Sequence, residues 1–464
     1  MSDGSSLDRV FKAYDVRGLV PDDLSPTLVR EVGAAFAEWS KAAKIIVARD
    51  CRLTSPELAA AIAEGATSRG VDVVDIGLAS SDLMYFASGA LDLPGVMVTA
   101  SHNSKQYNGL KFCLERAKPV SEDTGLADIR AIVETGNRPR VASSGTVERR
   151  SMLDAYVEHV LTFVDATTIR PLTVVIDTAN GMGGLVAPAV LERLPVKVIS
   201  LFPELDGTFP NHRADPMDPD NKRWLRDAVL ERGADIGLAF DDDADRVFLV
   251  DERAQDVTGS SVTAFIAQAM LRRDPGATIL YNLICSWAVP EVIRENGGTP
   301  IRTRVGHSFI KKVMADTGAI FGGEHSGHFY FRKNYHADSG MITSVLALQL
   351  LSDAGDPLSA LIAPFIRYFD SGEVNSEVDE KQARIEAVDR ALADGRRDRL
   401  DGLTVEFDDW WCNVRPSNTE PLLRLNVEAR TAELLREKTA SVLAIIHNGD
   451  SPASEDAERH EGGP

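Results

Sequence analysis

The chain has 464 residues, of which 44% are hydrophobic and 26% charged, and its formal net charge is −20. This composition is typical of a globular protein with several domains, and the net charge argues against general binding to nucleic acid or to anionic membranes. The sequence has no long apolar stretch, no signal-peptide pattern and only four widely spaced cysteines. We therefore expect a cytoplasmic protein with reduced thiols, no membrane span and no zinc site.

Strand-like and helix-like segments alternate along most of the chain, which predicts α/β layers. Ser25-Pro26 begins a helix that continues through Trp39, and Thr54 to Glu57 begin another. Strands are predicted at 44–48, 71–76, 96–99, 174–176, 236–240, 247–250 and 279–281. Several of these strands end in small polar loops, which is where ligands gather in α/β sheets.

The last quarter of the chain has a different pattern. A charged helix is predicted at 380–398, strands at 403–407 and 422–428, and a helix at 432–447. We therefore predict three α/β domains, at 1–148, 149–252 and 253–368, an α+β domain at 369–448, and a disordered polar tail at 449–464.

The most informative motif is Asp241-Asp242-Asp243-Ala244-Asp245-Arg246, which lies between two predicted strands. Asp241, Asp243 and Asp245 alternate, so they can point to one side, and their mutual repulsion favours a bound cation. Three hard oxygen ligands suit Mg²⁺ better than zinc, and Arg246 suits an anion beside the metal. A calcium-binding loop and a solvated acidic turn are the alternatives, although Arg246 stands where a calcium loop needs glycine.

A second loop, Thr99 to Asn103, follows a predicted strand and presents Ser101. A serine hydroxyl is a poor nucleophile without help, and His102 and Lys111 lie close along the chain. A serine that only caps a helix is the alternative. A Ser-His-Asp hydrolase is disfavoured because no Gly-x-Ser-x-Gly motif surrounds Ser101.

Two further loops carry groups that suit a phosphorylated sugar. Gly322 to His328 combines glycines with Glu, Ser and His side chains, which suits a polyhydroxylated ligand better than a metal, and Gly306-His307-Ser308 precedes a basic helix start. Arg415 to Pro421 offers a guanidinium, two hydroxyls and an amide, which can form a phosphate cradle or simply a turn with an exposed arginine. One such loop falls in each of the four predicted domains.

Together these motifs resemble the α-D-phosphohexomutase family over nearly the whole chain. The matching pieces are Tyr14 to Gly18, Thr99 to Asn103, Asp241 to Arg246, Gly323 to His328 and Arg415 to Pro421. The sugar loop is most similar to the bacterial phosphomannomutase/phosphoglucomutase branch. The resemblance implies three αβα-layered domains with mixed sheets and a C-terminal α+β domain of the TATA-binding-protein-like type, around a central cleft. It also implies interconversion of hexose 1-phosphate and hexose 6-phosphate, of mannose and/or glucose, through a phosphoserine enzyme and a hexose 1,6-bisphosphate intermediate.

The resemblance further implies the roles of individual residues. One Mg²⁺ per chain is held by Ser101, Asp241, Asp243 and Asp245, with Ser101 as the phosphoserine. The transferring phosphoryl group is surrounded by Arg17, His102, Lys111 and Arg246. Substrate contacts come from Tyr14, His307, Glu324, Ser326 and His328, and the non-reacting phosphate is bound by Arg415, Ser417, Asn418 and Thr419.

The sequence departs from the family pattern at two places. Asp242 stands where glycine is usual, and the segment 282–285 lacks a lysine that some dual-specificity members carry, which leaves the preferred sugar open. A phosphoglucosamine mutase, a Ser-dependent metal phosphatase and a non-catalytic sugar-phosphate sensor are the alternative functions. The expected ligands are a phosphorylated hexose and hexose 1,6-bisphosphate as activator, and the expected state is a monomer or weak homodimer.

Overall fold

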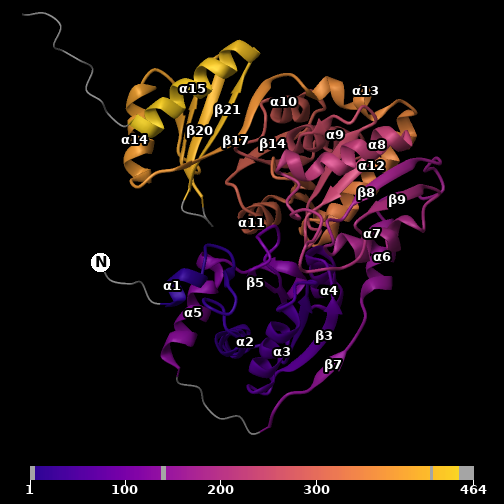
Figure 1. The fold of residues 1–464 in the computed structure, drawn as a ribbon, viewed down its shortest axis with the longest axis vertical. Coiled ribbons are helices and arrows are strands. Elements are labelled where there is room, and N and C mark those ends of the chain that lie inside the picture. The colour runs from indigo at the N-terminus through magenta and orange to yellow at the C-terminus, as the bar shows by residue number, and fades with distance from the viewer. Residues whose placement is uncertain (1–5, 137–142, 418–421, 449–464) are drawn as a thin grey trace, which may run out of the picture. The chain divides into compact units, whose positions relative to one another are not determined.

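The chain forms two compact units, Met1–Ile366 and Arg367–Pro464, in the computed structural model shown in Figure 1. The structure describes residues 6–136, 143–417 and 422–448. Within those residues, the first unit contains three β-sheets and the second contains one. The tail predicted at 449–464 lies outside the described residues.

The first sheet has mixed topology, with strand order β1-β5-β4-β2-β3-β7 and β6 beside β5. Strand β2 pairs in parallel with β3 and β4, whereas β5 is antiparallel to β4 and β1. Its strands are β1 Val16–Leu19, β2 Lys44–Arg49, β3 Asp72–Leu78, β4 Gly95–Val98, β5 Tyr107–Leu114, β6 Lys118–Pro119 and β7 Val147–Arg149. The accompanying helices are α1 Ser6–Val10, α2 Pro26–Ser40, α3 Ser55–Thr67, α4 Ser81–Leu91 and α5 Leu126–Thr135.

Helices cover both faces of this sheet. The predicted cap of α2 is confirmed, since the Ser25 hydroxyl accepts a hydrogen bond from the Leu28 amide and Pro26 is the first helical residue. Apolar side chains of α2, α3 and α5 pack against one face, and those of α4 pack against the other. Burying each such large side chain contributes about 1.5–3 kcal/mol, which fixes the sheet between two helical layers.

The second sheet has the order β12-β11-β10-β8-β9. Strands β10 and β11 form an antiparallel pair, and the acidic loop connects them. The elements are α6 Leu153–Leu161, β8 Thr173–Asp177, α7 Gly183–Leu191, β9 Lys197–Leu201, α8 Arg223–Arg232, β10 Ile236–Phe240, β11 Val247–Asp251 and β12 Asp256–Val257.

The third sheet has the order β14-β13-β15-β16. The sugar loop connects β15 to its antiparallel neighbour β16. The elements are α9 Gly259–Arg273, β13 Thr278–Asn282, α10 Ala288–Glu295, β14 Thr299–Thr303, α11 His307–Thr317, β15 Phe321–Gly323, β16 Phe329–Phe331, α12 Gly340–Ala354 and α13 Leu358–Ile362.

One apolar core runs through all three sheets of the first unit. Ile46, Leu238 and Phe321, one from each sheet, are fully buried members of the same cluster. Because interiors are close-packed, this shared core holds the loops of the three sheets in a defined arrangement.

The second unit is an antiparallel sheet, with order β17-β21-β20-β19-β18, and two helices. Its elements are β17 Phe369–Glu377, α14 Lys381–Ala391, β18 Arg396–Asp398, β19 Leu403–Glu406, β20 Trp410–Pro416, β21 Leu422–Ala429 and α15 Ala432–Asn448. The predicted fold class, three αβα-layered domains with mixed sheets and a C-terminal α+β domain, is confirmed.

The prediction of one helix over 380–398 is wrong at its end. The helix stops at Ala391, and the last three residues of the predicted range pair with β19 as an edge strand. The chain turns at Gly395, where an added Cβ would lie 2.3 Å from Val405. Glycine, which has no Cβ, lets the chain pass this close to β19 before it enters the edge strand β18.

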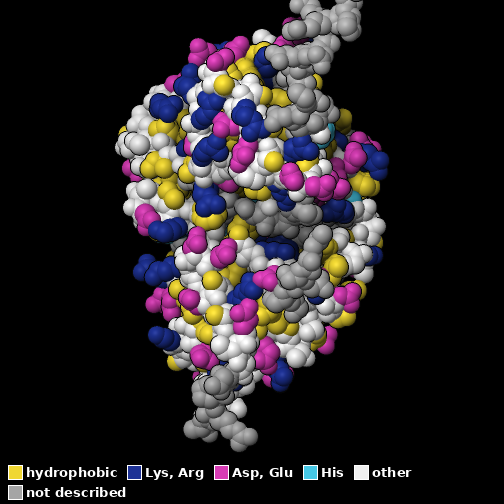
Figure 2. Space-filling model, turned by 90° about the vertical axis from the view of Figure 1, so that its left-hand side faces the viewer, with side chains coloured by type: hydrophobic (Ala, Val, Ile, Leu, Met, Phe, Trp, Pro, Cys, Tyr) yellow, Lys and Arg dark blue, Asp and Glu magenta, His cyan; other side chains and the backbone are white. Residues whose placement is uncertain are grey.

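On the face shown in Figure 2, acidic and basic side chains are interspersed, so the net negative charge is not gathered in one patch there.

Among the described residues, no single helix has the length and hydropathy of a membrane span, although the bent pair Gly340–Ala354 and Leu358–Phe365 meets both criteria when its two helices are taken together.

Candidate active site

The loop after β4 presents Ser101 toward the acidic loop. Ser101 has a positive φ of 50°, a conformation that costs free energy for a residue with a side chain. Its Oγ donates to Asp241 Oδ2 at 3.0 Å and lies 3.2 Å from Nδ1 of His102. Ser101, in the loop after β4 of the first sheet, is therefore in direct contact with the acidic loop after β10 of the second sheet, as predicted.

The acidic loop is buried, not solvated. Asp241, Asp243 and Asp245 each offer one oxygen within 4.8 Å of the others, as their alternation predicts. All three are 0–1% exposed, so the alternative of a solvated turn is wrong. The calcium-loop alternative is also wrong, because the flanking segments are the strands β10 and β11 and not helices.

Lys111 lies against two of these carboxylates. Its Nζ is 2.6 Å from Asp243 Oδ2 and 2.7 Å from Asp245 Oδ2. Burial, with the charges of Asp243 and Asp245, raises the pKa of Asp241 to about 7 against the lowering effect of Arg246. For Asp243 burial acts in the same direction, but the Lys111 ammonium and the Ser81 hydroxyl hold its pKa well below the ordinary value. The loop therefore needs positive charge to be ionised throughout.

Arg246 adds that charge, and Arg17 lies beside the Ser101 loop. The Nε of Arg246 donates to Asp241 Oδ2 at 2.9 Å, and its Nη2 is buried with no hydrogen-bond partner in the structure. Arg17 binds Asp15 at 2.5 Å and donates to the side chain of Asn103 in the Ser101 loop. Burial, followed by the charges of Arg246 and Arg17, holds the pKa of His102 well below its usual range, so its imidazole is neutral at pH 7.

The sugar loop is in direct contact with the acidic loop. His328 pairs with Arg246 in an isolated β-bridge, and its Nδ1 lies 2.8 Å from Asp338 and 3.7 Å from Asp245. Burial opposes the imidazolium, but Asp245 and Asp338 together raise the pKa of His328 above its ordinary value. His328 is therefore a neighbour of the acidic loop as well as a candidate sugar contact.

Glu324 is held by three donors at the end of β15. It accepts from Asn282 at 3.0 Å, from the Gly306 amide at 3.3 Å and from the Tyr330 hydroxyl at 2.5 Å. The residue just before α11, Gly306, is thereby joined to the sugar loop. The other predicted substrate contacts in this unit are Ser326, which is partly exposed, and Tyr14 and His307, whose rings pack edge to face with centroids 5.2 Å apart.

The predicted phosphate residues belong to the second unit. Arg415 on β20 is 3% exposed and donates to Asn413 and Asn426, and it also forms an ion pair with Glu373. Burial lowers the pKa of Arg415, whereas Glu373 opposes that effect. Ser417 donates its backbone amide to the Leu422 carbonyl, and Asn418 and Thr419 lie outside the described residues.

Two groups near Ser101 and the metal loop are absent from the sequence prediction. The Ser81 hydroxyl donates to Asp243 at 2.5 Å, and Arg52 donates to Asp242 at 2.8 Å. Arg52 lies in the loop after a predicted strand, where functional residues of α/β sheets gather, and this position could have identified it from the sequence. Ser81 begins a helix that carries no comparable motif.

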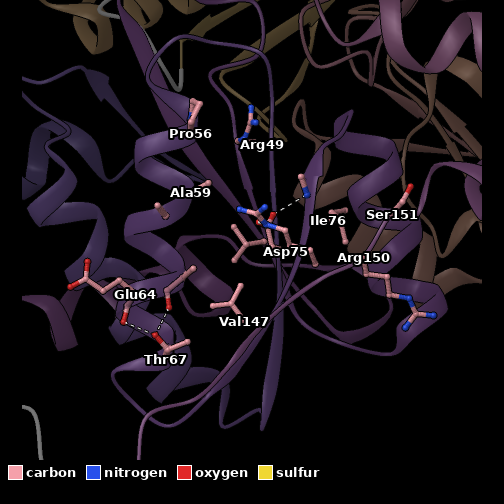
Figure 3. A pocket seen from close by; sticks show the side chains of 15 residues that line it. Arg49, Pro56, Ala59, Glu64, Thr67, Asp75, Ile76, Val147, Arg150 and Ser151 are labelled. Carbon is pink, nitrogen blue, oxygen red and sulfur yellow. Dashed lines mark hydrogen bonds and ion pairs between the residues drawn. The ribbon is translucent and has the colours of Figure 1, made fainter.

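A separate pocket of about 770 Å³ lies between α3 and the strands β2, β3 and β7 (Figure 3). Arg49, Asp75 and Arg150 are among its lining residues, with Val147 from the edge strand. It shares no residue with the predicted site, and the loops described above do not line it.

Comparison with known proteins covers the chain in four segments. Family models match residues 8–140, 154–255 and 258–368 as the α/β/α domains I, II and III of phosphoglucomutase/phosphomannomutase, and residues 373–445 as its C-terminal domain. A phosphomannomutase of Salmonella montevideo is 40% identical over 450 residues, which cover 94% of this chain and 99% of that protein.

Solved structures show the same relationship. A phosphoglucomutase/phosphomannomutase family protein of Burkholderia thailandensis superposes with a TM-score of 0.86 at 32% identity, covering 95% of this chain and 98% of that one. Two structures of Aspergillus fumigatus N-acetylphosphoglucosamine mutase share the fold at 13% identity, with TM-scores of 0.62 and 0.58. The first of these is a complex with glucose 1,6-bisphosphate and covers 97% of this chain and 96% of that one. The second is a complex with GlcNAc-6P and magnesium and covers 96% of this chain and 97% of that one. The four matched segments and the identity along nearly the whole length show that the chain belongs to the phosphoglucomutase/phosphomannomutase family and is a phosphohexomutase.

Proposed function

We propose that the chain interconverts the 1-phosphate and 6-phosphate of mannose and/or glucose, with Ser101 as the phosphoryl carrier. The observation that carries the proposal is the position of the Ser101 hydroxyl, 3.0 Å from Asp241 in the cluster of three convergent carboxylates. Mannose is favoured because the 40% identical relative is a phosphomannomutase. The four predicted domains belong to the same proposal, and the four separate sheets support them.

Mg²⁺ fits the donor set of this site. Asp243 and Asp245 each have a buried Oδ1 without a hydrogen-bond partner, and all donors of the proposed set are hard oxygens. Ser101, Asp241, Asp243 and Asp245 would hold one ion. When bound, it would supply positive charge next to the transferring phosphoryl group.

The phosphoryl transfer follows from the positions of these groups. The bond between the phosphorus and Ser101 Oγ breaks, and a new bond forms to the free hydroxyl of the sugar, which gives a hexose 1,6-bisphosphate. That intermediate then rotates in the site, and its other phosphoryl group is transferred to Ser101 Oγ. Arg246 has a free Nη2 for the charge that develops on the phosphoryl oxygens. His102, which lies beside Ser101, or Lys111 would manage the proton of the sugar hydroxyl.

The remaining substrate contacts are also assigned by this proposal. Tyr14, His307, Glu324, Ser326 and His328 would bind the sugar, and Arg415, Ser417, Asn418 and Thr419 would bind the phosphate that does not react. Because the intermediate presents either phosphate, the clamp has to accept both, and a hinge near residues 368–372 would allow this. We also propose a cytoplasmic location, which the four free cysteines support, and a monomer or weak homodimer.

A combined assay tests the proposal. Purified protein is incubated with Mg²⁺ and glucose 1,6-bisphosphate, its intact mass is measured, and turnover is assayed separately on mannose, glucose and glucosamine 1-phosphates. We expect one added phosphoryl group, and isomerisation of mannose or glucose 1-phosphate. Ser101→Ala should lose both, while Ser104→Ala in the same loop should keep both.

Other outcomes would select an alternative function. Release of inorganic phosphate without isomerisation would identify a phosphatase, and binding without a mass increase would identify a sensor. Preference for the glucosamine substrate would identify a phosphoglucosamine mutase.

A further inference from the structure

We propose that Arg52 and Asp242 form a positioning pair that sets the Ser101 loop against the metal loop. Neither residue belongs to the ligands or substrate contacts assigned above, and the proposal rests on the proposed role of Ser101. Arg52 follows β2 in the first sheet, and Asp242 lies on the loop after β10 in the second. The pair therefore joins two sheets at the point where the proposed chemistry occurs.

Arg52 uses every donor that its guanidinium has. Its Nε donates to Asp242 Oδ2 at 2.8 Å. Its two terminal nitrogens donate to four backbone carbonyls. Three lie in the loop between β4 and β5, those of Ser101 at 2.6 Å, Asn103 at 2.8 Å and Ser104 at 2.9 Å, and the fourth is that of Tyr107, the first residue of β5, at 3.0 Å. A guanidinium has five N–H donors in a fixed planar fork, so this set leaves it no freedom to rotate or to bind another group.

The carbonyls that Arg52 binds belong to a segment with an unfavourable backbone conformation. Ser101 itself has a positive φ, and residues with side chains hold such a conformation only when their surroundings impose it. The Ser101 amide adds one bond, to the Thr99 hydroxyl at 3.0 Å. Arg52 therefore supplies the main contacts that hold the proposed phosphoryl carrier in place.

Asp242 in turn holds Arg52. Both side chains are at most 1% exposed, and Asp50 adds a second carboxylate 3.3 Å from the Arg52 Nε. While Asp241 and Asp243 on either side point into the carboxylate cluster, Asp242 points away from it, toward Arg52. Its carbonyl also accepts the Met182 amide at 2.6 Å, which ties this residue to the start of α7.

Arg52 and Asp242 therefore connect the Ser101 loop and the acidic loop by hydrogen bonds. Residues that offer metal ligands flank Asp242 on both sides, and Asp242 reaches the Ser101 carbonyl through one guanidinium. A displacement of either loop is therefore transmitted to the other through two short hydrogen bonds. Because a displacement of about 1 Å can cost about a hundredfold in rate, the pair affects the phosphoryl transfer without touching the substrate.

Kinetics per active site test the proposal. The variants are Arg52→Lys, which keeps the charge but loses the fork, and Asp242→Ala and Asp242→Asn, which remove the acceptor or only its charge. Asp256→Asn is the control, because it removes an ion pair with a mostly buried lysine, Lys222, outside this site. The fraction of molecules phosphorylated on Ser101 by glucose 1,6-bisphosphate is measured by intact mass, and kcat is divided by that fraction.

We expect Arg52→Lys and Asp242→Ala to lower kcat per phosphorylated site by about tenfold to a hundredfold with KM little changed. Asp242→Asn should fall between them and the wild type, and Asp256→Asn should match the wild type. Wild-type kcat per phosphorylated site in Asp242→Ala and Asp242→Asn would overturn the positioning role, as would a rise in KM alone. Failure of the wild type to take up phosphate at Ser101 would instead overturn the proposed function.

Discussion

The ammonium of Lys111 lies 2.6 Å from Oδ2 of Asp243, although 132 residues separate the two in the chain. Lys111 therefore supplies, together with Arg246, part of the positive charge that the acidic loop needs.

Replacing Lys111 should change metal affinity and turnover in opposite directions. Lys111→Met removes a positive charge next to two proposed ligands, so Mg²⁺ should bind roughly tenfold to a hundredfold more tightly. Turnover should fall, because the same charge is proposed to face the phosphoryl group. Calorimetric titration with Mg²⁺ measures the first effect, with Lys111→Arg as the charge-retaining control. Weaker Mg²⁺ binding in Lys111→Met would contradict this charge balance.

Asp243→Asn should weaken Mg²⁺ binding and lower turnover together. The substitution removes one of the three convergent charges and one partner of Lys111. Mg²⁺ titration and the mutase assay are the measurements, and Asp165→Asn, in an exposed turn, is the control. The metal role is wrong if the wild type stays fully active in excess chelator.

Arg415→Lys should raise KM for 1-phosphate and 6-phosphate substrates alike. Lysine cannot reproduce a two-pronged grip on phosphate, and losing one charge-assisted contact costs roughly 1.5–3 kcal/mol, or about tenfold to a hundredfold in kcat/KM. Mg²⁺ affinity should stay constant. Arg397→Lys, which changes an arginine paired with Asp389 in the same unit, is the control. An effect on only one of the two substrates would refute the exchange of the two phosphates at this clamp.

Asp82 should make the stability of the first unit depend on pH. Its carboxyl accepts from the hydroxyls of Ser80, Tyr156 at 2.5 Å and Ser339 at 2.6 Å, which brings helices beside all three sheets together. Burial raises its pKa from 3.8 to about 6, against the effect of these three donors. The folded protein thus binds this proton more tightly than the unfolded chain does.

That difference determines the sign of the effect. The contribution to stability is complete below pH 3.8 and is lost as the pH rises through about 6. The free energy of unfolding of the wild type relative to Asp82→Asn should therefore fall by about 2 kcal/mol between pH 4 and pH 7. Chemical unfolding of both proteins over this pH range measures it, and a constant difference would show that Asp82 does not titrate there.

Several local features of this site could be predicted from the sequence. The alternation of Asp241, Asp243 and Asp245 between two strand patterns predicted a convergent set of carboxylates, because backbone geometry alone controls where neighbouring side chains point. The cap at Ser25 was predictable for the same reason, since all its partners lie within one helical turn. The order of the four loops also carried the family resemblance.

The distant groups that contact these loops could be identified only in the folded structure. Arg52 binds Asp242 across 190 residues, Ser339 binds Asp82 across 257, and the edge strand after Gly395 replaced the end of a predicted helix. No local preference encodes such pairs, because they depend on how three sheets pack around one apolar core. Strand order and close packing, which act over the whole unit, therefore determine which buried charges find partners, whereas periodicity and turn chemistry act only over a few residues.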